Sequence, residues 1–522
     1  MGSLLFFASL ALAFADEKPV TLLSGTGAWK HAIQTRDPEA QKYFDQGLAM
    51  MYGFNRYEAL RSFRKAAELD PRAPMPQWGI AMATGPYVNM DGDPTYDMTT
   101  SCAAAEAGLK LEIASPREHE YLQAVQTRCP EFKAPDDYIA AMRQLAAHWP
   151  DDLDALTLFA ESLMLPTRWR WYESSGAPAK GMPEAEAALE TVLRRWPNHP
   201  GANHLYIHAV ESSHTPERAV ASAQRLMGLT PEEGHMVHMP GHIWLVLGDW
   251  DMAASVNERA AEVDRRYFKK TGVTAGSYPM YYLHNLDFIA HARTMQGHRT
   301  EGLKATADLA AALQPMAEAM PEMADAYVAV PWFNLLRFEE WDTILKLPQP
   351  KPVQKIAAAF WHYVRAQALQ GQGKSAAAKQ EQQAFQEARK QVPDTTAWGQ
   401  NTTGPVFSLA SEILAAKIDG EAVSHLRRAV ELQDGLVYDE PPAWYYPIRE
   451  SLGAALLRSG NAADAEAVFR EGVQRSPRNG RMLFGLMESL RKQGKDEQAQ
   501  WVSKEYESVW AGSDVRLSID RL

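Results

Sequence analysis

The chain has 522 residues, of which 46% are hydrophobic and 23% charged, the balance of an ordinary soluble folded protein. This length accommodates either several globular domains or one long array of repeats. A net charge of −12 argues against a general affinity for nucleic acids or anionic membranes, because both would repel the protein.

The first fifteen residues, MGSLLFFASLALAFA, form an apolar leader that ends in Ala13-Phe14-Ala15, as at a signal-peptide cleavage site. We predict a signal peptide over residues 1–15, an N-terminal extension over residues 16–35, and a periplasmic or secreted mature protein. The leader lacks a positively charged start, so a disordered apolar tag is the alternative. No other apolar run reaches the ~18–20 residues that cross a bilayer, and we expect no membrane span.

A four-residue signature occurs near both ends of the chain. Two small residues, an aromatic residue and a proline follow one another at spacings of 12, 4 and 8. The two copies are Gly47, Ala59, Phe63 and Pro71, and Gly453, Ala465, Phe469 and Pro477. Small residues let two antiparallel helices approach, the aromatic ring fills their seam, and proline ends the second helix. We therefore predict an all-α, right-handed tetratricopeptide-type (TPR) solenoid over residues 36–510, with its last repeat at about 444–510.

Three irregular stretches and two cysteines interrupt this pattern. Residues 85–100, 166–181 and 398–407 are rich in turn-forming residues, and we predict long loops that roof the concave groove. Residues 151–164 and 184–196 are predicted to form a helical pair. Cys102 and Cys129 form either one disulfide or two buried thiols.

Histidines are concentrated in one part of the chain: eight of the fifteen fall between Gly201 and Arg293. Most of them recur with the period of a helical repeat, 34 or 49 residues apart. The recurring pairs are His204 with His238, His208 with His242, His235 with His284, and His242 with His291. Side chains that repeat in this way stack on one wall of a solenoid, and an i,i+4 pair lies on one helical face.

This register predicts a metal centre in the repeats at about residues 201–310. The predicted ligands are His204, His208, His235, His238, His242, His284 and His291. Nitrogen and oxygen ligands without cysteine indicate copper first, with zinc and iron as alternatives. So many imidazoles exceed one tetrahedral zinc site, which favours two or three metal ions. A polar groove lined by hydrogen-bonded histidines and a pH-sensing cluster are the other interpretations.

Further side chains are candidates for catalysis and for substrate binding. Glu211 follows His208 on the same predicted helix, and Glu161 is expected beside His208 in the neighbouring repeat. Each carboxylate is a ligand, a hydrogen-bond acceptor for an imidazole, a general base or part of a groove salt bridge. The candidates for substrate binding are Arg168, which would hold an anion, the loop residues Trp169 and Trp171, which are hard to bury there, and Tyr282.

Four long strings resemble a group of bacterial TPR proteins of poorly defined function. They are YFDQGLAMMYGFNRYEALRSFRKAAELDP from Tyr43, NHLYIHAVESSHTPERA from Asn203, GHMVHMPGHIWLVLGDWDMA from Gly234 and YDEPPAWYYPIRESLGAALLRSG from Tyr438. The resemblance implies an all-helical repeat fold and a histidine-rich centre at His204, His208, His238, His242 and His284. It supplies no reaction. Gly241 stands where the resemblance leads us to expect serine, which puts a hydroxyl near the centre in doubt.

The sequence as a whole predicts an exported metalloprotein that acts on a small molecule or a peptide. A metal-dependent oxidoreductase is the first interpretation and a metal-dependent hydrolase the second. A peptide- or protein-binding scaffold that uses the TPR groove is the main alternative, and a periplasmic protein of metal storage or delivery is another. Neither a phosphate-binding glycine loop nor a nucleophile elbow is present in the sequence.

Overall fold

The computed structural model of the protein describes residues 17–112, 115–273 and 276–522. The leader predicted over residues 1–15 lies outside this part of the chain. The described residues are helical almost throughout, and successive helices pack against one another in pairs, as the sequence predicted. None of the described helices is long and apolar enough to cross a membrane.

The helices of the N-terminal half follow one another in chain order, most of them with short connections. They are α1 (Pro38–Tyr52), α2 (Arg56–Leu69), α3 (Met75–Thr84), α4 (Met98–Leu109), α5 (Pro116–Gln126), α6 (Pro135–His148), α7 (Leu153–Met164), α8 (Met182–Arg195), α9 (Pro200–Glu211), α10 (Val220–Leu229), α11 (Gly234–His238), α12 (Pro240–Val246) and α13 (Trp250–Thr271). The pair predicted over residues 151–164 and 184–196 corresponds to α7 and α8.

The C-terminal half adds further helical pairs and one short hairpin. Its helices are α14 (Tyr278–Met295), α15 (Arg299–Ala319), α16 (Val330–Arg337), α17 (Trp341–Leu345), α18 (Lys355–Gly371), α19 (Ser375–Arg389), α20 (Thr403–Ile418), α21 (Ala422–Asp434), α22 (Arg449–Arg458), α23 (Ala462–Arg475), α24 (Gly480–Lys492) and α25 (Asp496–Val509). The hairpin pairs β1 (Ala397–Trp398) with β2 (Asn401–Thr402) in an antiparallel register.

The repeat signature packs as predicted at both ends of the solenoid. Phe63 of α2 is fully buried against Gly47 of α1 and Gly79 of α3. A Cβ atom on Gly47 or Gly79 would lie only 2.6 or 2.3 Å from the Phe63 ring, so the ring and the two helices approach closely because both residues are glycine. The C-terminal repeat has the same arrangement, with Phe469, Gly453 and Gly485. This seam defines a TPR-type solenoid.

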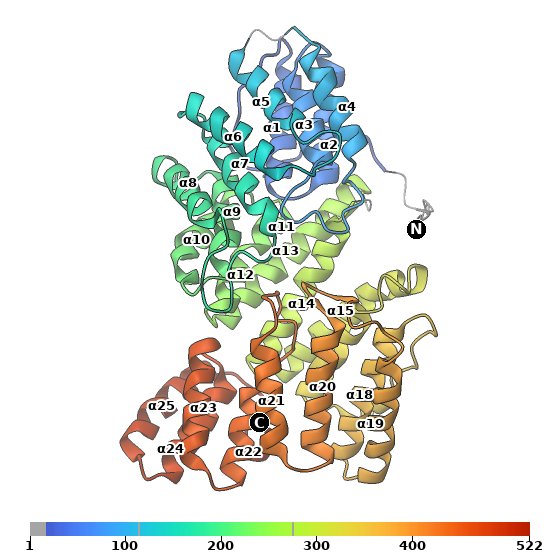
Figure 1. The fold of residues 1–522 in the computed structure, drawn as a ribbon, viewed down its shortest axis with the longest axis vertical. Coiled ribbons are helices and arrows are strands. Elements are labelled where there is room, and N and C mark those ends of the chain that lie inside the picture. Colours follow the sequence, from blue (N-terminus) through green and yellow to red (C-terminus); the bar gives the residue numbers. More distant parts are fainter. Residues whose placement is uncertain (1–16, 113–114, 274–275) are drawn as a thin grey trace.

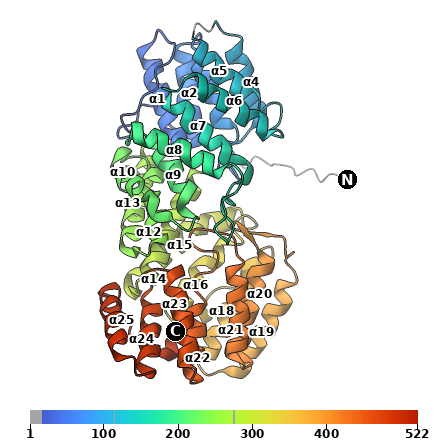
Figure 2. The same cartoon turned by 60° about the vertical axis from the view of Figure 1, so that its left-hand side comes forward.

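Two hydrophobic cores divide the molecule. One extends from Phe44 to Met295 and the other from Ala329 to Ala499. In Figures 1 and 2 the N-terminal helices form the upper part of the molecule and the C-terminal helices the lower part, with α14 and α15 at the junction. A smaller cluster of side chains from α13, α14 and α15 fills that junction.

The N-terminal extension is held on the repeats by one buried carboxylate, that of Asp154 in α7. Its side chain is 4% exposed and accepts four hydrogen bonds. The donors are Trp29 Nε1 at 3.0 Å, His31 Nδ1 at 2.7 Å, the Tyr52 hydroxyl at 2.6 Å and His199 Nε2 at 3.2 Å. Two of these donors, Trp29 and His31, belong to the extension, so Asp154 joins it to α1, α7 and α9.

The predicted loops and cysteines have mixed outcomes. Residues 85–97 and 168–181 lie outside the α-helices. The prediction of a loop throughout residues 398–407 was wrong in its second half, because α20 begins at Thr403 and Pro405 suits a first helical turn. Of the two alternatives for the cysteines, the structure has the disulfide Cys102–Cys129.

A segment of the C-terminal half reaches back toward the junction. Residues 437–446, named here the acidic strap, connect α21 to α22. Asn401 Nδ2 donates to the Val437 carbonyl at 3.0 Å and Trp398 Nε1 donates to the Ala443 carbonyl at 2.9 Å. The Asp439 carboxylate accepts a hairpin N–H at 2.9 Å. The hairpin therefore braces the strap along its length.

Candidate metal centre

The predicted histidines come from four helices at the end of the N-terminal core. His204 and His208 lie on α9, which is buried at every position, as expected for a helix enclosed on all sides. The helix that the sequence predicted around His238 and His242 is broken at Met239, because Pro240 cannot donate a helical hydrogen bond. His284 follows on α14.

Six of the seven predicted ligands form two groups of three. His204, His208 and His235 make triad A, and His238, His242 and His284 make triad B. Within each triad one potential ligand atom per residue lies within 4.8 Å of the others. The triads are adjacent, since the ring centroids of His235 and His238 are 5.5 Å apart. His284 is the only one of the six that is not buried.

Triad A presents imidazole nitrogens that have no hydrogen-bond partner. His204 Nδ1 donates to the Tyr52 carbonyl at 2.5 Å, and His208 Nδ1 donates to Glu211 Oε1 at 2.8 Å. Each Nε2 atom then carries a lone pair, and neither has a partner among the described residues. Both ring nitrogens of His235 also lack a partner, although this residue is only 2% exposed. Buried polar atoms are rarely left in this state, because each costs about 1–3 kcal/mol.

Triad B brings two lone pairs face to face. Asn257 Nδ2 donates to the Ala253 carbonyl at 2.8 Å, so its Oδ1 accepts the hydrogen bond from His238 Nδ1 at 2.6 Å. His242 Nδ1 donates to Glu211. Both Nε2 atoms are therefore acceptors, yet they lie 2.7 Å apart. A proton or a metal ion between them removes this repulsion.

Glu211 connects the two triads. Its fully buried carboxylate accepts hydrogen bonds from His208 of triad A and from His242 of triad B. Burial alone would raise the pKa of Glu211, but the charges and hydrogen bonds of His242 and His208 lower it. Because these hydrogen bonds occupy the Nδ1 atoms, Glu211 fixes the orientation of His208 and His242 as a hydrogen-bond acceptor.

One phenylalanine ring lies against each triad. The Phe54 centroid is 4.4 Å from His204, 5.8 Å from His208 and 5.3 Å from His235. The Phe288 centroid is 4.8 Å from His238, 5.3 Å from His242 and 4.9 Å from His284. Both phenylalanines are buried and neither was predicted. Their rings make each triad a pocket of low polarity.

The inserted loop completes the wall of triad A. Trp169 and Trp171 lie 5.6 and 6.1 Å from His208, between ring centroids, and are 7% and 1% exposed. The sequence singled out both rings as candidates for a substrate site because an inserted loop buries side chains poorly; here the loop folds inward and buries them against triad A. Trp169 and Phe54 have φ angles of 62° and 56°, in the left-handed region that L residues rarely adopt. Such strain is common where a site holds its walls in place.

Low polarity keeps most of these histidines neutral. Burial lowers the pKa of His204, His235 and His238 well below the usual value, and the neighbouring histidines lower it further. Burial also lowers the pKa of His242, and it lowers that of His284 to about 3. Neutral imidazole is the form that binds a metal ion.

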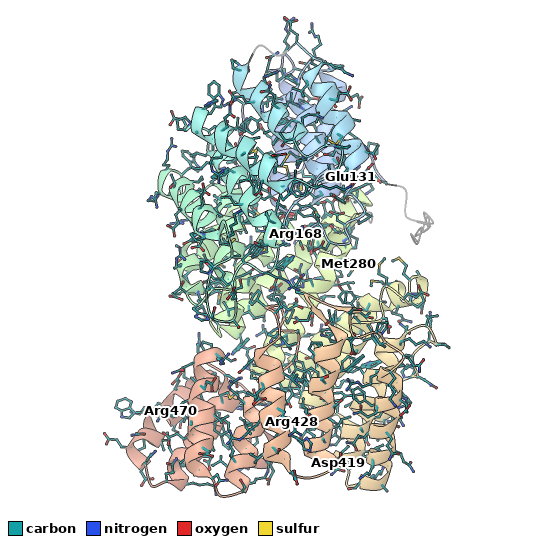
Figure 3. All side chains as sticks on the ribbon, viewed as in Figure 1. Glu131, Arg168, Met280, Asp419, Arg428 and Arg470 are labelled. Carbon is teal, nitrogen blue, oxygen red and sulfur yellow. A yellow bond between two sulfur atoms is a disulfide. The ribbon has the colours of Figure 1, made fainter. Side chains whose placement is uncertain are left out.

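The structure places four predicted site residues elsewhere. His291 packs against Trp250, about two helical turns beyond His284 on α14, and belongs to neither triad. Glu161 faces Arg56 at 3.5 Å rather than His208. Arg168, labelled in Figure 3, pairs with Asp91 at the surface. Tyr282 packs on Phe268, while its neighbour Tyr281 lies 4.4 Å from His235. Helix phase explains the last error, because adjacent residues face different sides.

Three further carboxyl groups lie near triad B, and the two that belong to the acidic strap were not predicted from the sequence. Glu440 of the acidic strap lies 3.6 Å from His242 Nδ1, and Asp439 precedes it. Asp287 follows His284 by one turn of α14. Burial and neighbouring carboxylates raise the pKa of Glu440 well above its usual value, and burial raises those of Asp439 and Asp287 to about 7. The strap is about 200 residues from the histidines in sequence, so spacing could not reveal it.

The structure also explains why position 241 is glycine. A Cβ atom on Gly241 would lie 2.5 Å from Asn257 Nδ2. Serine there would displace the amide that orients His238. Glycine in place of the expected serine therefore leaves room for the Asn257 side chain, which orients His238.

Comparisons with known proteins leave the function open. No known protein family matches the chain. A stretch of 55 residues is 40% identical to an uncharacterised protein of Aquifex aeolicus (strain VF5), which covers 10% of this chain and 7% of that relative. The chain therefore spans only a small part of the length of this relative.

Solved structures with related architecture have low similarity scores. The APC/C hetero-tetramer Cut9-Hcn1 has a TM-score of 0.32 and 12% identity, over 88% of this chain and 78% of that chain. The human IFIT1 dimer with m7Gppp-AAAA has a TM-score of 0.32 and 10% identity, over 92% of both chains. Yeast Tom70 has a TM-score of 0.29 and 10% identity, over 90% of both chains. The fold assignment rests on the helix packing of this chain itself.

Proposed function

We propose that this protein is a metal-binding helical-repeat protein whose centre takes two transition-metal ions, one in each histidine triad. The observation that carries the proposal is the set of buried imidazole nitrogens without partners in triad A, together with the facing Nε2 atoms of His238 and His242. Bonds of about 2.0–2.1 Å to a tetrahedral ion would hold nitrogen ligands ~3.4 Å apart. Small side-chain rotations bring atoms that lie within 4.8 Å to that spacing.

Copper is the metal we propose first. Both triads are built from imidazole without a thiolate or a carboxylate among the three ligands, a donor set that suits copper, zinc, iron and nickel. Among the divalent ions, Cu²⁺ binds nitrogen ligands more strongly than Zn²⁺ or Fe²⁺ does. Zinc and iron are the alternatives.

The metal that is found will indicate the class of reaction. A copper or iron pair supports oxidation of a small molecule or a peptide, whereas a zinc pair supports hydrolysis. Glu211 is placed to fix the orientation and tautomer of one histidine in each triad, rather than to move a proton at a substrate. Glu161, directed toward Arg56, has no direct contact with the centre.

The test is the metal content of the purified full chain. After reconstitution with copper and dialysis, we expect about two copper ions per chain by elemental analysis, and none with both His208→Ala and His242→Ala. A matched control removes two histidines outside the centre, His362 and His425, which pair with Glu381 and Glu412. Circular dichroism checks that each variant is folded. Wild-type protein that retains no metal, or a double variant that retains as much, would overturn the proposal.

Export is part of the same proposal. The Cys102–Cys129 disulfide is typical of proteins in oxidising compartments, and the apolar leader agrees with a periplasmic or secreted location. Cell fractionation with N-terminal sequencing of the mature protein tests this. A full-length protein in the cytoplasm would contradict it.

A protein-binding scaffold is the second candidate function. The observation that favours it is the TPR-type stack itself, because such solenoids commonly bind peptides or proteins along their concave face. The metal measurement separates the two candidates. A chain that folds fully and binds no metal would leave the scaffold as the remaining function.

A further inference from the structure

The two triads differ in how an ion reaches them. The ligands of triad A are buried, and so are His238 and His242 of triad B. His284 alone among the six is partly exposed. An ion from solution therefore approaches the centre on the side of His284, where α14 and the acidic strap meet.

This side carries three carboxyl groups. Asp287 lies three residues after His284 on α14, so both occupy the same helical face. Asp439 and Glu440 approach from the strap, and Glu440 lies 3.6 Å from His242 Nδ1. Within the described residues, none of the three forms an ion pair with a lysine or an arginine.

A separate observation indicates that a ligand belongs here. Glu440 is 9% exposed, yet its Oε2 atom has no hydrogen-bond partner in the part of the chain that the structure describes. The single N–H of His242 Nδ1 is already donated to Glu211. Glu440 therefore presents an unused acceptor at the base of the acidic group.

We propose that Asp287, Asp439 and Glu440 form a capture site for hydrated divalent cations, which precedes the histidine ligands on the path of metal uptake. Carboxylates bind hydrated cations through oxygen and exchange them readily. A cleft lined by one sign of charge raises the local concentration of the opposite ion and the rate of association by about 10–1,000-fold. The imidazoles then hold the ion more strongly, since they are the better ligands for a transition metal.

This inference rests on the proposed metal centre, and uptake kinetics distinguish the two. Cu²⁺ is mixed with metal-free full-length protein, and uptake is followed by tryptophan fluorescence, because Trp169 and Trp171 lie beside His208. The test variant combines Asp287→Asn with Asp439→Asn, which preserves shape; at pH ~8, above the pKa of about 7 of both carboxyls, it removes two charges. The matched control combines Glu421→Gln with Glu431→Gln, two exposed carboxylates of the C-terminal half. Both variants have the same net charge.

The expected result is an association rate at low salt at least ~10-fold below wild type for the test variant, and unchanged for the control. The final copper content stays the same. The difference disappears at 1 M salt, where the screening length is about 3 Å. If the test variant misfolds, the salt dependence of the wild-type association rate still tests whether electrostatic attraction speeds copper uptake.

Three outcomes would overturn the inference. Equal rates for wild type and the test variant at low salt would do so, with the proposed metal centre intact. Loss of bound copper in the test variant would make the carboxylates permanent ligands. Uptake by the wild type that does not depend on salt would remove the electrostatic role. A wild type that binds no copper would remove the proposed function first.

Discussion

Two buried clusters of histidine and carboxylate in this protein have similar composition and opposite chemistry. At Asp154, atoms of His31, Asp152 and Asp154 lie within 4.8 Å of one another, as do those of each histidine triad. Asp154, however, accepts four hydrogen bonds and only one atom each of His31 and Asp152 lacks a partner there, whereas triad A leaves four nitrogens of its three histidines without one. Proximity of potential ligands is thus shared, and hydrogen bonding separates the two clusters.

The difference bears on what each cluster can bind. A carboxylate surrounded by donors stabilises the fold, and its saturation leaves little for an ion to bind. Imidazoles held at Nδ1, with their Nε2 atoms facing one another, are oriented without being satisfied. A site that folding leaves incomplete in this way is prepared for a ligand.

The largest predicted effect is that of low pH on the free energy of unfolding of the metal-free protein. Burial lowers the pKa of His291 to about 4, with a smaller contribution from Arg337. Burial also lowers the pKa values of five further histidines: His204, His235, His238, His242 and His284. The unfolded chain binds protons below pH ~6.5 that the folded chain cannot, so stability falls as pH falls. His291 alone accounts for about 3 kcal/mol between pH ~6.5 and ~4.

The contribution of His31, in the Asp154 cluster, to stability changes with pH in the opposite direction. Burial lowers the pKa of His31, but the hydrogen bond and charge of Asp154 outweigh it and raise the pKa overall. Its contribution is complete below pH ~6.5 and is lost as pH rises through the raised value. For metal-free protein we expect the free energy of unfolding to fall by at least about 3 kcal/mol between pH ~6.5 and ~4. Urea denaturation in chelator at several pH values measures this, and a free energy of unfolding that is constant from pH ~7 to ~4.5 would contradict it.

Removing the satisfied carboxylate has the next largest effect. Asp154→Ala leaves four donors without their acceptor, and we expect a loss of about 3–5 kcal/mol in the free energy of unfolding. Metal content should not change. The matched control is Asp151→Ala, whose side chain is 95% exposed and pairs with Arg195 at the surface, with an expected change below ~0.5 kcal/mol. Equal thermal unfolding of both variants would show that Asp154 is not the anchor.

Much of the fold could be predicted from the sequence because it depends on local spacing. Phe63 with Gly47, and Phe469 with Gly453, follow from the geometry of two packed helices, and both pairs are in contact. The histidine register placed six ligands in two adjacent groups for the same reason. His291 has the right period but lies about two turns beyond His284 along α14, because a repeat period fixes the face of a helix and not the depth of a site.

The rest of the site depends on contacts that spacing does not encode. Phe54 and Glu440 lie beside the triads, although they are about 150 and 200 residues from the histidines in sequence. Phe54 is placed there by its left-handed backbone conformation, and Glu440 by the acidic strap. The inward turn of Trp169 depends on a left-handed φ angle that no motif indicates. Burial of the inserted loop was missed for this reason, although its position beside the histidines was expected.

The smallest predicted effect is that of replacing His235, the residue whose hydrogen bonding differs most from that of Asp154. His235 makes no hydrogen bond through either ring nitrogen, so His235→Leu removes two unpaired polar atoms and leaves no partner behind. We expect metal-free protein to change by less than ~1 kcal/mol, or to gain stability, since an apolar group of similar size suits such a site. His204→Leu is the matched variant, because it leaves the Tyr52 carbonyl unpaired and should cost about 1–3 kcal/mol more. Both variants should lose the metal ion of triad A. A loss for His235→Leu as large as that for His204→Leu would mean that His235 stabilises the fold without metal, and triad A would then resemble the Asp154 cluster.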